Sequence, residues 1–155
     1  VDFLSLKIIW IYNIKNNKIE LQPEFFIDEK TNELLKRSQL QNRDILFVIA
    51  GATIGKMGRI EESEAYVNQR VLLFKNNSNV DKDYLFYVLQ QNKFQQYILN
   101  HIDSESAQPN ISAATVGKYE FLLPSLKIQN KIGKFLRLID DKINVNNRIN
   151  DNLAA

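Results

Sequence analysis

The stretch Gly51–Gly58 (GATIGKMG) combines three of the chain's five glycines with a lysine, a composition typical of loops that bind phosphate. A nucleotide-binding loop has four residues between its glycines and a Ser or Thr after the lysine. Here three residues separate Gly51 from Gly55, and a methionine follows Lys56, so nucleotide hydrolysis is not expected. The loop could hold a nucleic-acid phosphate through its amides, with Lys56 and Arg59 as nearby cations. It could also be a tight turn between buried strands.

A second set of polar groups lies on Tyr66–Lys75, which predicts a strand. The alternation of side chains places Tyr66, Asn68 and Arg70 on one face of that strand. Arginine can donate two hydrogen bonds to guanine, and asparagine can pair with adenine, so this face could read base edges. An ordinary solvent-exposed face is the alternative.

The loop Gln108–Ser112 (QPNIS) presents amide and hydroxyl groups without charge, and Pro109 makes its backbone rigid. Such a loop suits either hydrogen bonding to bases or bracing of the body against the C-terminal helix described below.

The sequence offers little material for a catalytic or metal site. It contains no cysteine, and a single histidine, His101, excludes a site built on several histidines. Asp28-Glu29-Lys30, with Glu24 nearby, loosely matches the acidic end of a metal-dependent nuclease site, but its surroundings predict a solvated polar loop. The sequence contains neither a G-x-G cofactor loop nor an Asn-Pro-Pro motif, the two patterns that would indicate methyl transfer. We therefore expect no enzyme activity, no cofactor and no metal.

Composition indicates a soluble globular protein, with 45% hydrophobic and 25% charged residues. The net charge of +2 permits nucleic-acid binding through a local patch without requiring it. No apolar run approaches the roughly 20 residues needed to span a bilayer, so we expect no membrane contact and a cytoplasmic location.

The elements that must position these groups form an irregular series of strands and helices. That irregularity predicts an α+β fold with a mixed sheet rather than strict βαβ units. The apolar run Asp44–Ala50 is expected to be a buried central strand. Further strands are predicted at Phe3–Ile14, Ile19–Phe26, Tyr66–Lys75 and Tyr119–Leu123, and helices at Glu33–Leu40 and Asp83–Asn100, the latter capped by Asp81.

Ser125–Leu153 predicts a long C-terminal helix of about 40 Å. Its apolar side chains recur in steps of four and three, a pattern typical of a coiled-coil-forming helix. We divide the chain into a body (1–124) and a helix for helix–helix pairing (125–155). The predicted pairing residues are Ile128, Ile132, Phe135, Ile139, Ile149 and Leu153, with Lys142 and Asn146 filling the two polar places in the series.

Taken in order, several segments resemble the target-recognition domain of type I restriction–modification specificity subunits. The resemblance runs from about Asp44 to the C-terminus. Its segments are Arg43–Gly55 (RDILFVIAGATIG), Asn68-Gln69, Tyr84–Leu89 (YLFYVL), Ala107–Ser112 (AQPNIS) and Glu120–Leu138 (EFLLPSLKIQNKIGKFLRL).

The resemblance implies a non-catalytic, sequence-specific DNA-binding module. In that family, two recognition domains each read half of a split target, and long helices pair antiparallel to set their separation. Methyltransferase and restriction subunits carry out the chemistry. The implied partners are therefore double-stranded DNA, those two subunits, and a second specificity half or a second copy of this chain joined through the C-terminal helix. The alternative is a helix-mediated protein–protein adaptor without DNA contact. Candidates for DNA contact are Lys56, Arg59, Arg70 and Lys118, together with Asn68, Gln108, Asn110 and Ser112.

Overall fold

The computed structural model describes residues 6–21, 26–27, 39–61, 65–67, 70–75, 77–103 and 108–154. The chain divides into two compact units. One comprises Val1–Lys75 with Asn92–Glu120, and the other comprises Asn76–Gln91 with Phe121–Ala155. Most of the predicted helix Glu33–Leu40, the acidic stretch Asp28–Lys30 and Asn68 lie outside the described residues.

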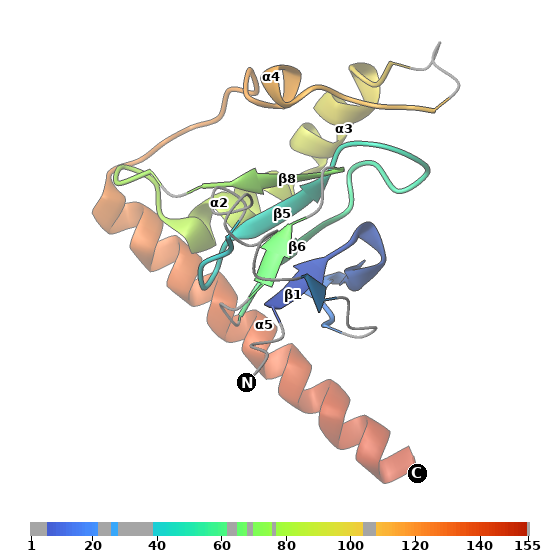
Figure 1. Ribbon diagram of the computed structural model, residues 1–155. Helices are drawn as coiled ribbons and strands as arrows, with labels where there is room; N and C mark the ends of the chain where they lie inside the picture. The colour runs from blue at the N-terminus through green and yellow to red at the C-terminus, as the bar shows by residue number, and fades with distance from the viewer. Residues whose placement is uncertain are drawn as a thin grey trace. The chain divides into compact units, whose positions relative to one another are not determined.

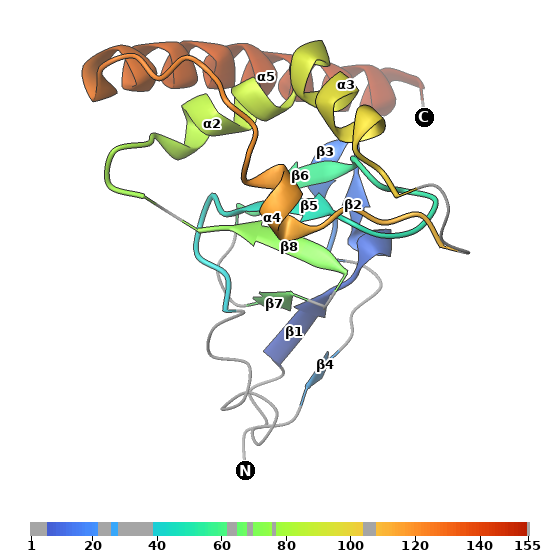
Figure 2. The same ribbon diagram turned by 90° about the horizontal axis from the view of Figure 1, so that it is seen from above.

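The first unit is built on a five-stranded mixed sheet (Figures 1 and 2). β3 and β6 run parallel, whereas the other neighbouring pairs are antiparallel. This mixed sheet, together with the helices, confirms the predicted α+β class. The strand order is β2 (Ile14–Lys15), β3 (Asn17–Ile19), β6 (Met57–Arg59), β5 (Ile45–Val48) and β8 (Val71–Phe74).

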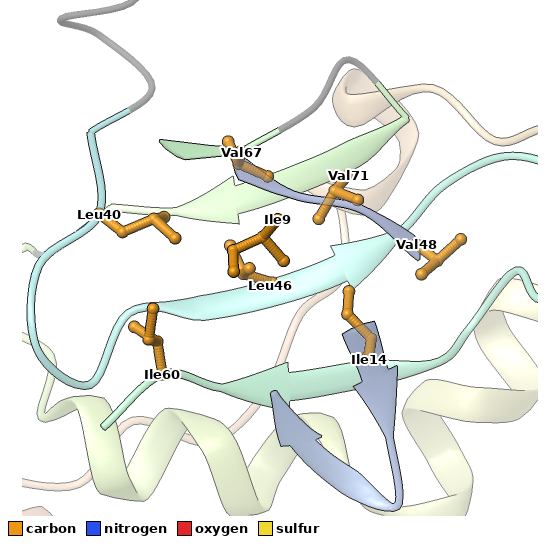
Figure 3. Close-up of a cluster of buried hydrophobic side chains, with 8 residues drawn as sticks. All are labelled: Ile9, Ile14, Leu40, Leu46, Val48, Ile60, Val67 and Val71. Carbon is orange, nitrogen blue, oxygen red and sulfur yellow. The ribbon is translucent and has the colours of Figure 1, made fainter. Parts of the chain in front are cut away.

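A second sheet of three strands carries β1 (Leu6–Ile9) between β4 (Phe26–Ile27) and β7 (Ala65–Val67). Buried side chains from both sheets form one cluster, so a hydrophobic core lies between them (Figure 3). All four residues of β5 are buried, which confirms the predicted buried strand. The cluster consists of Ile9, Ile14, Leu40, Leu46, Val48, Ile60, Val67 and Val71.

Phe47 points to the other face of the five-stranded sheet, because successive side chains alternate along a strand. Its ring meets Phe94 of α3 (Asn92–Asn100) edge to face, with 5.5 Å between ring centroids. The Phe94 ring in turn packs against Tyr119, at 5.0 Å. Helix α3 therefore supplies the apolar cover for this face, and the short helix α4 (Ala113–Val116) follows it in the chain.

The second unit consists mainly of α2 (Lys82–Leu89) and the long helix α5 (Leu126–Ala154). The side chain of Asp81 accepts the backbone N–H of Tyr84 at 2.8 Å and caps α2, as predicted. The carbonyl of Ser125 accepts the first backbone bonds of α5, from Ile128 and Gln129. The 29 residues of α5 confirm the predicted long C-terminal helix.

The single helix predicted over Asp83–Asn100 is wrong, because the chain forms two helices separated at Gln90 and Gln91. Gln90 is the C-cap of α2. The apolar periodicity continues across this break, and neither Gly nor Pro marks it, so the pattern suggested one helix. The two helices belong to different compact units.

The single strand predicted over Tyr66–Lys75 is also wrong. Its first part is β7, which pairs with β1, and its second part is β8, which pairs with β5. Arg70 lies in a turn before β8 rather than on a strand face. The alternation of side chains persists across the change of sheet, so it could not reveal the break.

Two N-terminal predictions require correction as well. The strand expected over Phe3–Ile14 is interrupted by the short 3₁₀ helix η1 (Ile11–Asn13). Asn13 is buried, and its side chain accepts the N–H of Trp10 and donates to the carbonyl of Glu20, which holds this turn closed.

The second strand expected over Ile19–Phe26 is divided as well, because Ile19 ends β3 in one sheet and Phe26 begins β4 in the other. The final strand expected over Tyr119–Leu123 does not form. There, the ring of Tyr119 packs against aromatic neighbours instead of entering a sheet.

Candidate nucleic-acid interface

One end of the five-stranded sheet collects most of the predicted DNA-contact segments. The register pairs Phe47 with Met57 and Val48 with Val71, so β5 ends where β6 and β8 begin. The two figures show the loop after β5, the start of β8 and the β2–β3 hairpin on this side (Figures 1 and 2). We call this the loop end of the sheet; it comprises Asn16–Asn17, Gly51–Lys56, Arg70 and Gln108–Ser112.

Ile49, just after β5, connects two of these segments. Its N–H donates to the carbonyl of Arg70 at 3.2 Å, and its own carbonyl accepts the N–H of Ile111 at 2.9 Å. The N–H of Gly51 also donates to the carbonyl of Pro109, at 2.9 Å. The loop Gln108–Ser112 therefore braces the glycine loop. The bond from Ile49 to Arg70 holds the backbone of Arg70 beside the end of β5.

The glycine loop is a tight turn whose geometry requires glycine at two places. Gly51 and Gly55 have φ values of +87° and +89°, which side-chain-bearing residues rarely adopt. The N–H of Gly55 returns to the carbonyl of Val48 at 3.1 Å, and the N–H of Lys56 donates to the carbonyl of Thr53 at 3.1 Å. This folding leaves the side chain of Lys56 exposed at the loop end.

The predicted contact residues of the QPNIS loop are exposed as well, and part of their hydrogen bonding is structural. The hydroxyl of Ser112 accepts the N–H of Thr115 at 3.0 Å and caps α4. Asn110 forms backbone bridges with Ala50 and Asp103. Gln108 lies beside Gly51, where an added Cβ would be 3.6 Å from its side-chain nitrogen. These amides are thus held in place by a rigid backbone.

Three predicted contact residues are not brought to this end by the described contacts. Arg59 pairs with Ile45 at the opposite end of the sheet, is only 8% exposed, and donates through Nε to Glu61 at 3.0 Å. Lys118 is exposed in the turn after α4. Asn68 lies outside the described residues. A DNA-contact role for these residues stays a prediction, and the burial of Arg59 favours a structural role for its guanidinium.

Sequence reasoning missed the β2–β3 turn as part of the loop end. Lys15 pairs with Lys18 across this turn, and Asn16 and Asn17 form its tip. The register places Asn17 beside Gly58, so the tip lies next to the start of β6. The signal available in the sequence was the Asn-Asn pair, which favours the positive φ values that a two-residue hairpin needs.

The predicted pairing residues form an exposed apolar stripe along α5. The exposed fraction of the apolar pairing residues ranges from 38% for Ile132 to 81% for Leu153. Lys142 and Asn146 are exposed too. Next to Lys142, Ile143 is 50% exposed and continues the stripe. The predicted spacing of four and three residues did not include Ile143, and it also missed the exposed Leu138 and Val145.

The adjacent side of α5 packs against α2. Gln129, Gly133 and Asp140 each follow a stripe residue by one position, which turns them about 100° around the helix. Gln129 is 1% exposed and hydrogen-bonds to the backbone of Asp81 at 2.9 Å. The hydroxyl of Tyr87 donates to Asp140 at 2.7 Å. Contact with α2 thus uses one side of α5 and leaves the apolar stripe exposed.

The described residues also bear on metal binding and on membrane insertion. Among those residues, no group of three or more His, Cys, Asp or Glu side chains is placed to hold a metal ion. Within the same part of the chain, no helix is both long enough and apolar enough to cross a membrane.

Comparison with known protein families identifies the chain. The family model described as the type I restriction modification DNA specificity domain matches residues 7–155. This match covers nearly the whole sequence, including the loop end of the sheet, α2 and α5. The chain therefore belongs to the type I restriction–modification DNA specificity domain family, and its role in such a system is DNA sequence specificity.

Proposed function

We propose that this chain reads one half of a bipartite duplex DNA target and has no catalytic role of its own. The observation that carries the proposal is the convergence of Lys56, Arg70, Gln108 and Asn110 at one end of a rigid sheet. Cations and amides held together in this way match the two requirements of DNA recognition, which are phosphate contacts and base contacts.

The chemistry divides between the two kinds of side chain. Lys56 extends its exposed ammonium from the glycine loop, so we assign it to the DNA backbone. The neutral amides of Gln108 and Asn110 can hydrogen-bond with adenine edges. Arg70 suits either a phosphate or the acceptor edge of guanine.

We assign helix α5 to pairing with a second recognition module, in a coiled coil that sets the spacing of the two half-sites. The exposed apolar stripe supports this assignment. A helix that stays exposed to water has no use for such a stripe, whereas a helix that pairs with another helix buries it. The second module would be another specificity half or a second copy of this chain. In this proposal residues 1–124 recognise DNA and residues 125–155 pair, while methyltransferase and restriction subunits supply the chemistry.

Selection of bound duplexes from a randomised DNA library tests the proposal directly. The purified chain is expected to enrich a short common pattern and to bind more weakly as salt rises from about 50 to 200 mM, because binding releases counterions. Enrichment of no pattern, or affinity that ignores salt, would overturn it.

The alternative is a helix-mediated adaptor without DNA contact, supported by the same exposed stripe. The double variants Lys56→Gln/Arg70→Gln and Ile132→Asp/Ile139→Asp separate the two functions. DNA reading predicts that the first variant loses DNA and still self-associates. If the first variant keeps its full DNA retention and the second loses every interaction, the adaptor function is correct.

A further inference from the structure

The turn between β2 and β3 is a rigid two-residue hairpin. Asn16 and Asn17 have φ values of 50° and 61°, and Lys15 pairs with Lys18 across the turn. Two consecutive positive φ values match the twist of antiparallel strands, and asparagine tolerates them better than most residues. The turn therefore presents a fixed tip to its surroundings.

Gly58 holds this hairpin against the sheet. A Cβ on Gly58 would lie 2.8 Å from the carbonyl oxygen of Lys18, closer than real contacts allow. Only glycine lets β3 approach β6 this closely, and the register then sets Asn17 beside Gly58. Since Lys56 comes directly before β6, the hairpin tip and the glycine loop share one end of the sheet.

The tip combines amide and ammonium groups. Lys15, Asn16, Asn17 and Lys18 are all exposed. Glu20 follows β3, away from the tip, and its carboxylate forms an ion pair with the ammonium of Lys15 at 2.7 Å. The two tip residues are thus uncharged amides between two lysines.

We propose that the Asn16–Asn17 turn is a further base-reading element, which enters the major groove beside the glycine loop. The major groove admits a two-stranded β-ribbon, and asparagine amides can pair with adenine there. The exposed Lys18 adds a cation beside the turn that suits a flanking phosphate. This inference rests on the proposed DNA-reading function and adds a second set of specificity residues to it.

The variant Asn16→Gly/Asn17→Gly tests the inference while preserving the turn, because glycine also accepts positive φ. In selections from a randomised duplex library, the wild-type chain and this variant are expected to enrich patterns that differ at one or two positions. The salt dependence should stay unchanged, since no charge is removed. The control Asn147→Ala/Asn152→Ala removes two exposed amides of α5 and should keep the wild-type pattern.

A second variant, Asn16→Asp/Asn17→Asp, keeps residues that tolerate positive φ but replaces amide donors by carboxylates. Its affinity for a wild-type-selected duplex should fall about tenfold or more, because the base contact is lost and the new carboxylates repel the DNA phosphates. A wild-type pattern in the glycine variant, or wild-type affinity in the aspartate variant, would overturn the inference and leave the proposed function intact. If the wild-type chain itself enriches no pattern, both fail.

Discussion

The side-chain oxygen of Gln129 accepts the backbone N–H of Asp81 at 2.9 Å, a bond that joins residues 48 positions apart. The amide nitrogen of Gln129 donates to the carbonyls of Pro124 at 2.8 Å and Asn79 at 3.1 Å. The side chain of Gln129 is only 1% exposed, and it makes all three bonds. One amide therefore fastens the start of α2 to the first turns of α5.

Replacing Gln129 by alanine should destabilise the α2–α5 pair by about 3 kcal/mol, because three backbone groups lose their hydrogen-bond partner. Urea unfolding gives the total change, and hydrogen exchange of the Tyr84–Leu89 amides localises it. The neighbouring Asn130 is exposed, so Asn130→Ala serves as the matched control. A loss below about 0.5 kcal/mol for Gln129→Ala, within the ordinary range of surface changes, would contradict this role.

Gly133 is a position where α5 lies directly against the cap of α2. A Cβ there would lie 2.7 Å from the carboxylate of Asp81 and 2.8 Å from the backbone nitrogen of Tyr84. We expect Gly133→Ala to destabilise the pair by about 1–3 kcal/mol through overpacking, even though alanine gains about 1 kcal/mol in helix propensity. Thermal unfolding measures the change, with the exposed Lys134→Ala as control. A stabilised Gly133→Ala protein would show that the two helices separate easily.

Charge removal should weaken DNA binding at the loop end of the sheet and have no effect at the opposite end. Lys56→Gln or Arg70→Gln at the loop end should weaken binding to a random-sequence duplex and reduce the salt slope by about 0.9 for each lost phosphate contact. The exposed Lys75 follows β8 at the opposite end, so Lys75→Gln is the matched control and should leave the slope unchanged.

Arg59 lies at that opposite end, with its guanidinium paired to Glu61. Arg59→Gln should therefore leave the salt slope as it is. A drop equal to that of Lys56→Gln would establish Arg59 as a DNA contact after all.

The elements that the sequence predicted well are those with a local cause. The run around Ile45–Val48 is apolar throughout, and a run of this length is typical of a buried strand. Asp81 precedes α2 as a cap, and the stripe of α5 extends over many turns. In contrast, the break at Gln90 and the division between β7 and β8 depend on which distant strand or helix each segment contacts. No local pattern carries that information.

The candidate site shows the same division. The types of residue at Lys56 and Gln108 suggested DNA contact from the sequence alone, but their proximity depends on the bonds around Ile49 and Gly51. Arg59 looked equivalent to Lys56 because only three positions separate them. In a strand those positions span about 10 Å, which carries Arg59 away from the loop end and into a buried position.

Interruption of the apolar stripe should prevent helix pairing without unfolding the chain. Ile139 is 43% exposed, so Ile139→Asp should leave the monomer stable while it places a charge in the proposed helix–helix interface. Sedimentation at micromolar concentrations should show weaker self-association than for wild type. Asn130→Asp adds the same charge on another side of α5 and should have no effect. Equal sedimentation of Ile139→Asp and wild type would place the pairing surface elsewhere.

Asn146 occupies a polar position within this stripe, where a buried asparagine can fix the register of a coiled coil at some cost in stability. We expect Asn146→Leu to strengthen pairing but to shift or loosen the register, because an apolar residue accepts several alignments. The chain has no native cysteine, so Asn147→Cys introduces a single spin-label site for distance measurement between two copies. The wild-type background should give one narrow distance, and the Asn146→Leu background a broader or displaced one. Asn130→Leu should keep the narrow distance, and an unchanged distance in Asn146→Leu would show that the register is set by other residues.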